Sequence, residues 1–243
     1  MKLRHYLALI AAALILLGSF FLPNAVAGIT DMRTLGALTM IDSQSISFDL
    51  TPELSVPERI ALAASPNTEM LPVITGNSMD EKAAGNRAAH ELSLFFQGDA
   101  FELDHSEMTV SEGSAALIID TAAPEQNMII WEFDLSDPAG NSVTVTIDDE
   151  TGVIVRLIYI SSDWSGAMFD SEIYRSADGQ FFEASKILTE MMTEYFGIPV
   201  ALSDYKYSGN LSYYRADIKR GGLVVPMYGV VRAASFTINE RLY

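Results

Sequence analysis

The sequence predicts an α+β fold in which a helix followed by antiparallel strands occurs twice. Two stretches, near residues 78–97 and 181–196, carry apolar residues at helical spacing. Each is followed by short segments in which apolar and polar residues alternate, separated by Gly, Pro, Asn and Asp. This order is typical of a helix that covers one face of an antiparallel sheet.

The first 27 residues predict an export signal or a membrane anchor. Lys2 and Arg4 precede an uncharged apolar run at 6–22, and small residues at Ala25 and Ala27 fit signal-peptidase cleavage. The run is also close to the shortest helix that spans a bilayer. Cleavage after Ala27 and retention as an anchor with a cytoplasmic N-terminus are both open. Either outcome places the remaining chain at the cell surface or releases it from the cell.

Composition excludes several classes of function. The chain has 32 acidic and 15 basic residues, a formal net charge of −17 at pH 7. Such a charge repels phosphates and anionic lipids. We therefore expect no nucleic-acid partner, and membrane contact only through an uncleaved N-terminal segment. The absence of Cys excludes disulfides, thiol catalysis, thiolate metal sites and lipoprotein acylation, and fits a bacterial envelope protein.

The pattern divides the chain into five segments. They are a signal peptide or anchor (1–27), an N-terminal extension (28–77), a first helix-plus-sheet unit (78–161), a polar connector (162–180) and a second helix-plus-sheet unit (181–243). In the extension we expect a strand at 45–50, a helix at 55–64 and a strand at 70–75. The expected strands of the two units lie near 101–110, 114–121, 127–135, 142–148, 153–161, 201–208, 211–219, 223–231 and 234–241.

Two Ser-x-x-Glu capping boxes mark helix starts. Ser55 and Glu58 bracket Pro57, a residue tolerated in the first helical turn. Ser78 and Glu81 precede the longer, Ala-rich helix.

One hairpin resembles a known family. Strand residues 130–135 contain Trp131, a polar turn occupies 137–141, and strand residues 143–148 lead into Asp149-Glu150-Thr151-Gly152. This series is similar to the final hairpin of PepSY domains, and the resemblance covers about residues 78–160. It implies a non-catalytic, helix-first module of secreted or membrane proteins, linked with binding or restraining peptidases. The second unit lacks the Trp and the Thr-Gly turn, so its PepSY-like or cystatin-like character rests on element order alone.

The same hairpin can also be interpreted as ordinary core. Its alternating apolar residues occupy one face of each strand and can meet across the hairpin. They are Trp131, Phe133, Leu135, Val143, Val145 and Ile147.

No catalytic residue, metal ligand set or cofactor site is predicted. His90 and Glu91 lack the second His of the H-E-x-x-H motif, and His105 lies in a polar segment. Five Asp and Asn residues near the hairpin turns have oxygen atoms suited to Ca²⁺, but their spacing is not that of a calcium loop, and turn formation explains them. They are Asp134, Asp137, Asn141, Asp148 and Asp149.

A Tyr-rich surface in the second unit is the candidate partner-binding site. In the strand at 211–219, Tyr213 and Arg215 share the face opposite Tyr214, and Tyr207 lies on the preceding strand. An exposed Tyr beside alternating charges predicts recognition, and a solvated strand face is the alternative.

These features predict a non-enzymatic extracytoplasmic module that recognises a protein or peptide partner, such as a peptidase or a membrane complex. Two alternatives stay open: an envelope protein that binds wall polymer, and an extracytoplasmic hydrolase that uses carboxylates.

Overall fold

The computed structural model describes residues 54–97, 108–162, 177–209, 211–232 and 234–239. All of them belong to one compact unit. The expected signal or anchor, the strand at 45–50 and His105 lie outside the described residues. No helix in these ranges is long and apolar enough to cross a membrane.

Three helices and ten strands occur in this part of the chain, which confirms a mixed α+β fold dominated by sheet. The helices are α2 (Val56–Ala64), α3 (Glu81–Phe95) and α4 (Ala177–Phe196). The strands are β1 (Thr68–Val73), β2 (Thr109–Val110), β3 (Ser114–Asp120), β4 (Asn127–Ser136), β5 (Ser142–Asp148), β6 (Ile154–Ile160), β7 (Val200–Ser208), β8 (Leu211–Arg220), β9 (Leu223–Arg232) and β10 (Ser235–Ile238).

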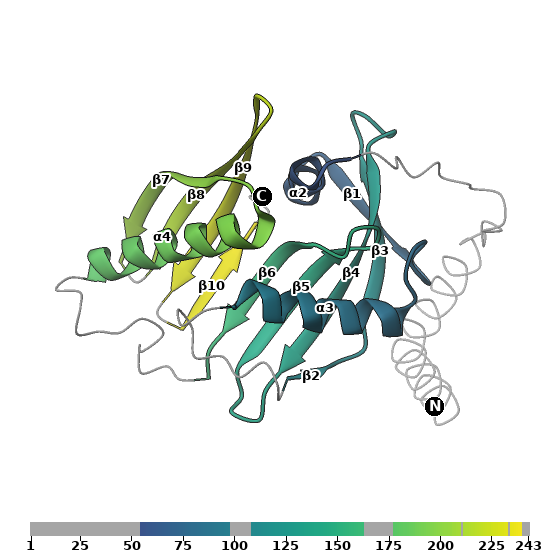
Figure 1. Cartoon of the computed structure of the whole chain (residues 1–243), viewed down its shortest axis with the longest axis horizontal. Helices are drawn as coiled ribbons and strands as arrows, with labels where there is room; N and C mark the ends of the chain where they lie inside the picture. The colour runs from purple at the N-terminus through teal and green to yellow at the C-terminus, as the bar shows by residue number, and fades with distance from the viewer. Residues whose placement is uncertain (1–53, 98–107, 163–176, 210, 233, 240–243) are drawn as a thin grey trace, which may run out of the picture. The chain divides into compact units, whose positions relative to one another are not determined.

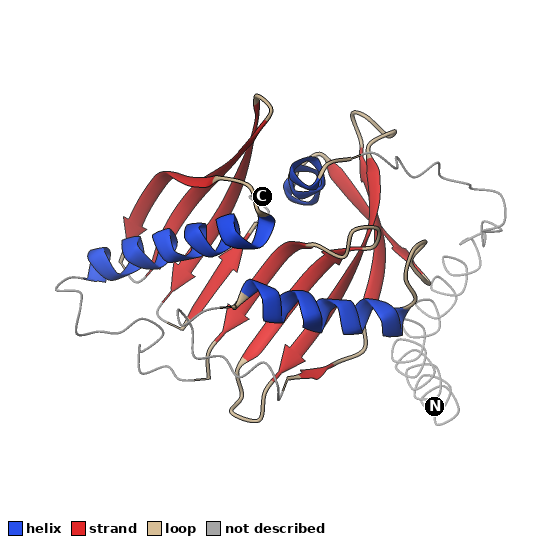
Figure 2. Ribbon diagram, viewed as in Figure 1, coloured by secondary structure: helices blue, strands red, loops and turns tan. Residues whose placement is uncertain are grey.

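The strands form one antiparallel sheet in the order β1-β3-β4-β5-β6-β10-β9-β8-β7, with β2 paired to β4 (Figures 1 and 2). A helix followed by a four-strand meander occurs twice, as α3 with β3–β6 and as α4 with β7–β10. The last strands of the two meanders, β6 and β10, pair with each other, with Tyr159 opposite Phe236. The two helix-plus-sheet sets therefore share one continuous sheet.

The helices pack on this sheet and enclose one hydrophobic core. Helix α3 contacts β4, β5 and β6, α4 contacts β7, β8 and β9, and the two helices touch each other. Aromatic rings fill the junction of the meanders: Phe236 stacks on Tyr159 at 5.3 Å between ring centroids and lies 6.2 Å from Phe96. Helix α2 packs against β3, β6 and β9.

The β4–β5 hairpin has the register that its alternation predicts. Trp131 lies opposite Ile147, Phe133 opposite Val145, and Leu135 opposite Val143. All six side chains are buried. The face that carries them belongs to the core, as the apolar pattern requires.

Helix starts differ in detail from the sequence expectation. Glu58 accepts hydrogen bonds from the backbone N–H and hydroxyl of Ser55, at 2.8 and 2.6 Å, which agrees with the first capping box. In the second, the N-cap is Asp80, whose carboxylate accepts from the Ala83 N–H at 2.8 Å, and not Ser78. Helix α4 begins at Ala177, inside the expected connector.

Candidate functional site

Strand β1 forms one end of the sheet and pairs only with β3 among the described strands. In an antiparallel pair of strands, residues whose backbone groups hydrogen-bond to the neighbouring strand alternate with residues whose backbone groups point away from it. Two bonds fix this alternation: Thr121 N–H donates to the Asn67 carbonyl at 2.9 Å, and Asp120 N–H donates away from β1, to the Gln126 carbonyl, at 3.0 Å. It follows that the N–H and C=O of Met70 point away from β3.

The same edge carries apolar side chains in solvent. Met70 is 46% exposed, Leu71 is 43% exposed and Ile74, just beyond the strand, is 99% exposed. Met70 and Leu71 lie on opposite faces because they are neighbours in a strand. The edge therefore offers apolar contact on both faces together with an outward main-chain donor and acceptor.

Pro72 limits the length of this edge. It lies opposite Ala116, at a position whose backbone groups also point away from β3. Proline has no N–H, but at this position no hydrogen bond between β1 and β3 is lost. On the outer side, Pro72 offers only its carbonyl as an acceptor.

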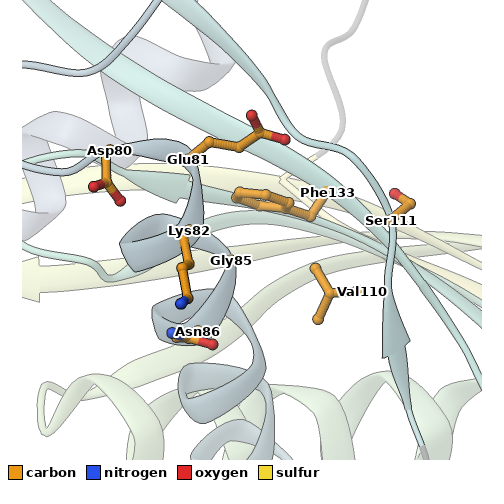
Figure 3. Close-up of a pocket in the computed structure, with 8 residues that line it drawn as sticks. All are labelled: Asp80, Glu81, Lys82, Gly85, Asn86, Val110, Ser111 and Phe133. Carbon is orange, nitrogen blue, oxygen red and sulfur yellow. The ribbon is translucent and has the colours of Figure 1, made fainter.

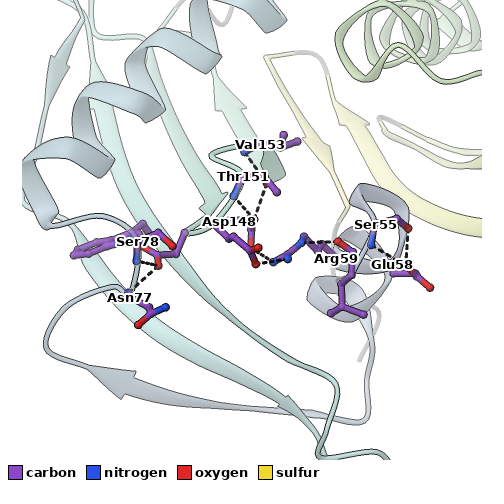
Figure 4. A network of polar contacts seen from close by, with 12 residues as sticks. Ser55, Glu58, Arg59, Asn77, Ser78, Asp148, Thr151 and Val153 are labelled. Atoms are coloured by element: carbon purple, nitrogen blue, oxygen red, sulfur yellow. Dashed lines mark hydrogen bonds and ion pairs between the residues drawn. The ribbon is translucent and has the colours of Figure 1, made fainter. Parts of the chain in front are cut away.

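Asp149 holds the loop that follows β1. Its carboxylate accepts from the backbone N–H groups of Asn77, Ser78 and Met79 at 2.8, 2.6 and 3.2 Å, and from Trp131 Nε1 at 2.8 Å (Figure 4). Asp149 is almost completely buried. The loop after β1 is thereby tied to the β5–β6 turn and to Trp131 of β4.

A second polar anchor joins α2 to the β5–β6 turn (Figure 4). Arg59 Nη1 donates to Asp148 Oδ1 at 2.8 Å, its Nε donates to the Leu54 carbonyl, and its Nη2 pairs with Glu150. The other Asp148 oxygen accepts from the backbone N–H and hydroxyl of Thr151. Asp148 and Asp149 thus anchor segments that are far away in the chain. The sequence analysis interpreted both residues as turn formers and missed this role, because these partners are not close to them in sequence.

A pocket of about 450 Å³ lies between the first turn of α3, β2 and the ring of Phe133 (Figure 3). Its two carboxylates are engaged by backbone: Asp80 caps α3, and Glu81 Oε1 accepts from the Gly113 N–H at 3.1 Å. Lys82, Asn86 and Ser111 are its other polar lining residues. Both acids accept hydrogen bonds from backbone N–H groups, so the fold itself accounts for their positions.

The structure separates the three predicted partner-binding residues. Tyr213 is exposed, and on the same face of β8 the guanidinium of Arg215 binds Asp217 Oδ1 at 2.8 Å, which raises the pKa of Arg215. Tyr207 lies opposite Ser212, on the other face, and its ring packs 5.6 Å from that of Phe181 in α4. Tyr213 and Arg215 can therefore share a surface, and Tyr207 belongs to another.

The remaining sequence candidates in the described ranges are exposed or have local partners. His90 is exposed. Asp134 accepts from Thr144 at 2.6 Å, and Asp137 binds Asn141. In the ranges that the structure describes, no three His, Asp or Glu side chains are grouped so as to hold a metal ion.

A partly buried contact between the two long helices was not predicted. Tyr195 of α4 donates to Glu91 of α3 and accepts from the Ile154 N–H at 3.0 Å. Arg87 pairs with Glu91 at 2.7 Å. The pKa of Tyr195 is raised well above its usual range. Burial is the largest cause, and the hydrogen bond to Glu91 is the second.

No family model, curated protein or solved structure matches this chain. Its function must therefore be inferred from its own residues and contacts, and the β1 edge is the feature whose geometry best suits binding.

Proposed function

We propose that this chain is a non-enzymatic binding module that recognises an extended segment of a protein or peptide partner at β1. The observation that carries the proposal is the outward backbone of Met70 beside exposed apolar side chains. In strand addition, main-chain hydrogen bonds supply affinity and alternate side chains supply specificity. The β1 edge presents both kinds of group.

The opposite edge of the sheet supports this assignment by contrast. Strand β7 is irregular between Leu202 and Asp204, and it exposes the charges of Asp204 and Lys206. A bulge and exposed charges are devices that blunt an edge against pairing. Strand β1 has a regular register, one charged residue and exposed apolar side chains. Only the β1 edge, of these two, keeps the features that another strand needs.

The expected export segment places such a module outside the cytoplasm, at the cell surface or released from it. The order of α3 and the β4–β5 hairpin, with Trp131 buried in the core, agrees with the PepSY-like resemblance. A peptidase or a membrane complex is accordingly the partner class that we propose.

A wall-polymer binder would need aromatic rings lining one groove. Tyr207 and Tyr213 lie on opposite faces, so these two rings do not line one groove. In the pocket beside α3, both carboxylates accept hydrogen bonds from backbone N–H groups, so this pocket gives the hydrolase alternative no specific support. Partner binding at β1 is therefore the function that the contacts favour.

A photo-crosslinking amino acid at Leu71 in the full-length chain, expressed in its own cells, tests this proposal. We expect one dominant protein adduct. Met70→Pro removes an outward N–H without removing a β1–β3 bond, so it should abolish the adduct. Met70→Thr keeps the N–H and serves as the matched control. An adduct that persists in Met70→Pro, or recovery of wall polymer alone, would overturn the proposal.

A further inference from the structure

We propose, on the basis of the strand addition inferred above, that the β1 edge selects a short apolar segment that carries Lys or Arg. The choice of partner follows from charge, from the order of side chains along β1 and from the position of Pro72.

The segments that form and flank β1 and β3 carry only acidic charges. Residues 65–79 and 111–126, which contain β1, β3 and their flanks, include four carboxylates and no Lys, Arg or His. These carboxylates are Glu69, Glu112, Asp120 and Glu125. In a chain of net charge −17, they favour a basic segment and steer its approach at low salt.

The register of β1 positions the basic residue. Glu69 and Leu71 lie opposite Ile119 and Leu117 on one face, and Met70 lies on the other face. A residue added opposite exposed Glu69 gains from positive charge, while those opposite Met70 and Leu71 gain from apolar side chains. Written from its N-terminus to its C-terminus, the favoured segment is therefore apolar-apolar-basic when it runs antiparallel to β1. It is basic-apolar-apolar when it runs parallel to β1.

Pro72 shortens the added strand. After Met70, the next residue whose backbone groups point outward is Pro72, which has no N–H to donate to an added strand. We therefore expect the added segment to span only about five residues. A segment of this length gains little from main-chain bonds alone, so the charge pair contributes a large share of the selectivity.

A second copy of this chain is the less favourable occupant. Two chains of net charge −17 repel, and pairing two β1 edges brings both Glu69 side chains into one interface. A basic partner removes both penalties.

Peptide binding to the full-length chain in neutral detergent tests the inference. Fluorescent peptides K-V-I-V-V-K and E-V-I-V-V-E, in one-letter code, share an apolar centre that fits either strand direction and differ only in flanking charge. We expect the Lys peptide to bind roughly ten-fold tighter at about 50 mM salt, with the gap narrowing at about 300 mM. Glu69→Lys should reverse the preference. Glu190→Lys, the same charge change on the exposed side of α4, should preserve it.

The outcomes separate this inference from the proposed function. Equal binding of both peptides, abolished by Met70→Pro, would overturn the charge selection and leave strand addition standing. Peptide binding unaffected by Met70→Pro would overturn both. A dimer that Met70→Pro dissociates would show that a second copy occupies the edge, which also overturns the inference.

Discussion

Arg59 of α2 and Asp148 of β5 form an ion pair at 2.8 Å, 89 positions apart in the chain and almost completely out of solvent. Arg59 is 3% exposed and Asp148 is 0% exposed. Each partner has further hydrogen bonds, to Leu54 and Glu150 on one side and to Thr151 on the other. A buried pair with its remaining donors and acceptors satisfied is costly to break, because removal of one charge leaves the other stranded.

We therefore expect Asp148→Ala to lower the free energy of unfolding by about 3–5 kcal/mol. Glu150→Gln, which removes the partly exposed partner of the same guanidinium, should cost only about 0–1 kcal/mol. Urea unfolding of the two variants beside the parent chain measures the difference. Equal losses in both variants would show that burial adds nothing to this pair.

Asp149→Asn should loosen the loop at Asn77–Met79 and with it the exit of β1. An amide has one acceptor oxygen and an NH₂ group that cannot accept from the surrounding N–H donors. We expect a loss of about 1–3 kcal/mol and faster amide hydrogen exchange in this loop. The control is Asp134→Asn, an exposed residue bonded to Thr144. Unchanged exchange at residues 77–79 would contradict an anchoring role for Asp149.

The cap of α2 predicts a dependence on acid pH. Hydrogen bonds from the hydroxyl and the N–H of Ser55 lower the pKa of Glu58. A lowered folded-state pKa gives stability that is present above the unfolded Glu pKa of about 4.3 and is lost as pH falls through the folded value. Ser55→Ala should cost about 0.5–2 kcal/mol at neutral pH, with a smaller cost once Glu58 is protonated. Unfolding curves near pH 7 and pH 3 compare the two states, and an equal cost at both would refute the linkage.

The sequence predicted correctly those helices and strands that are determined by residues close together in the chain. The alternation of Trp131, Phe133 and Leu135 indicated the buried face of β4, and Ser55 with Glu58 marked the start of α2. The second start was misplaced by two residues because Ser78 and Asp80 are both good caps, and the Ser78 N–H is held by Asp149, 71 positions away. That contact has no signal in the local sequence.

The candidate site escaped prediction for a similar reason. The alternation of Tyr213 and Arg215 indicated their shared face, but whether a strand lies at an edge depends on the order of the whole sheet. Sequence pattern indicated a strand near Met70 without showing that β3 would cover only one of its sides. The pairing of β6 with β10 likewise joins residues far apart in the chain, so one continuous sheet could not be distinguished from two.

The hydroxyl of Tyr195 predicts a loss of stability at alkaline pH. Burial, then the bond to Glu91, raises the pKa of this tyrosine in the folded chain. Its contribution is fully present below the unfolded Tyr pKa of about 10 and is lost as pH rises toward the higher folded value. Above pH 10 the unfolding free energy should fall by about 1.4 kcal/mol per pH unit for this group.

Tyr195→Phe should flatten that slope and, at pH 7, cost about 1–3 kcal/mol because Glu91 and the Ile154 N–H lose a partner. Tyr213→Phe, at an exposed ring, is the control and should leave the slope unchanged. Denaturant unfolding between pH 8 and about pH 11 tests this, and the same slope in parent and Tyr195→Phe chains would assign the alkaline loss to other groups.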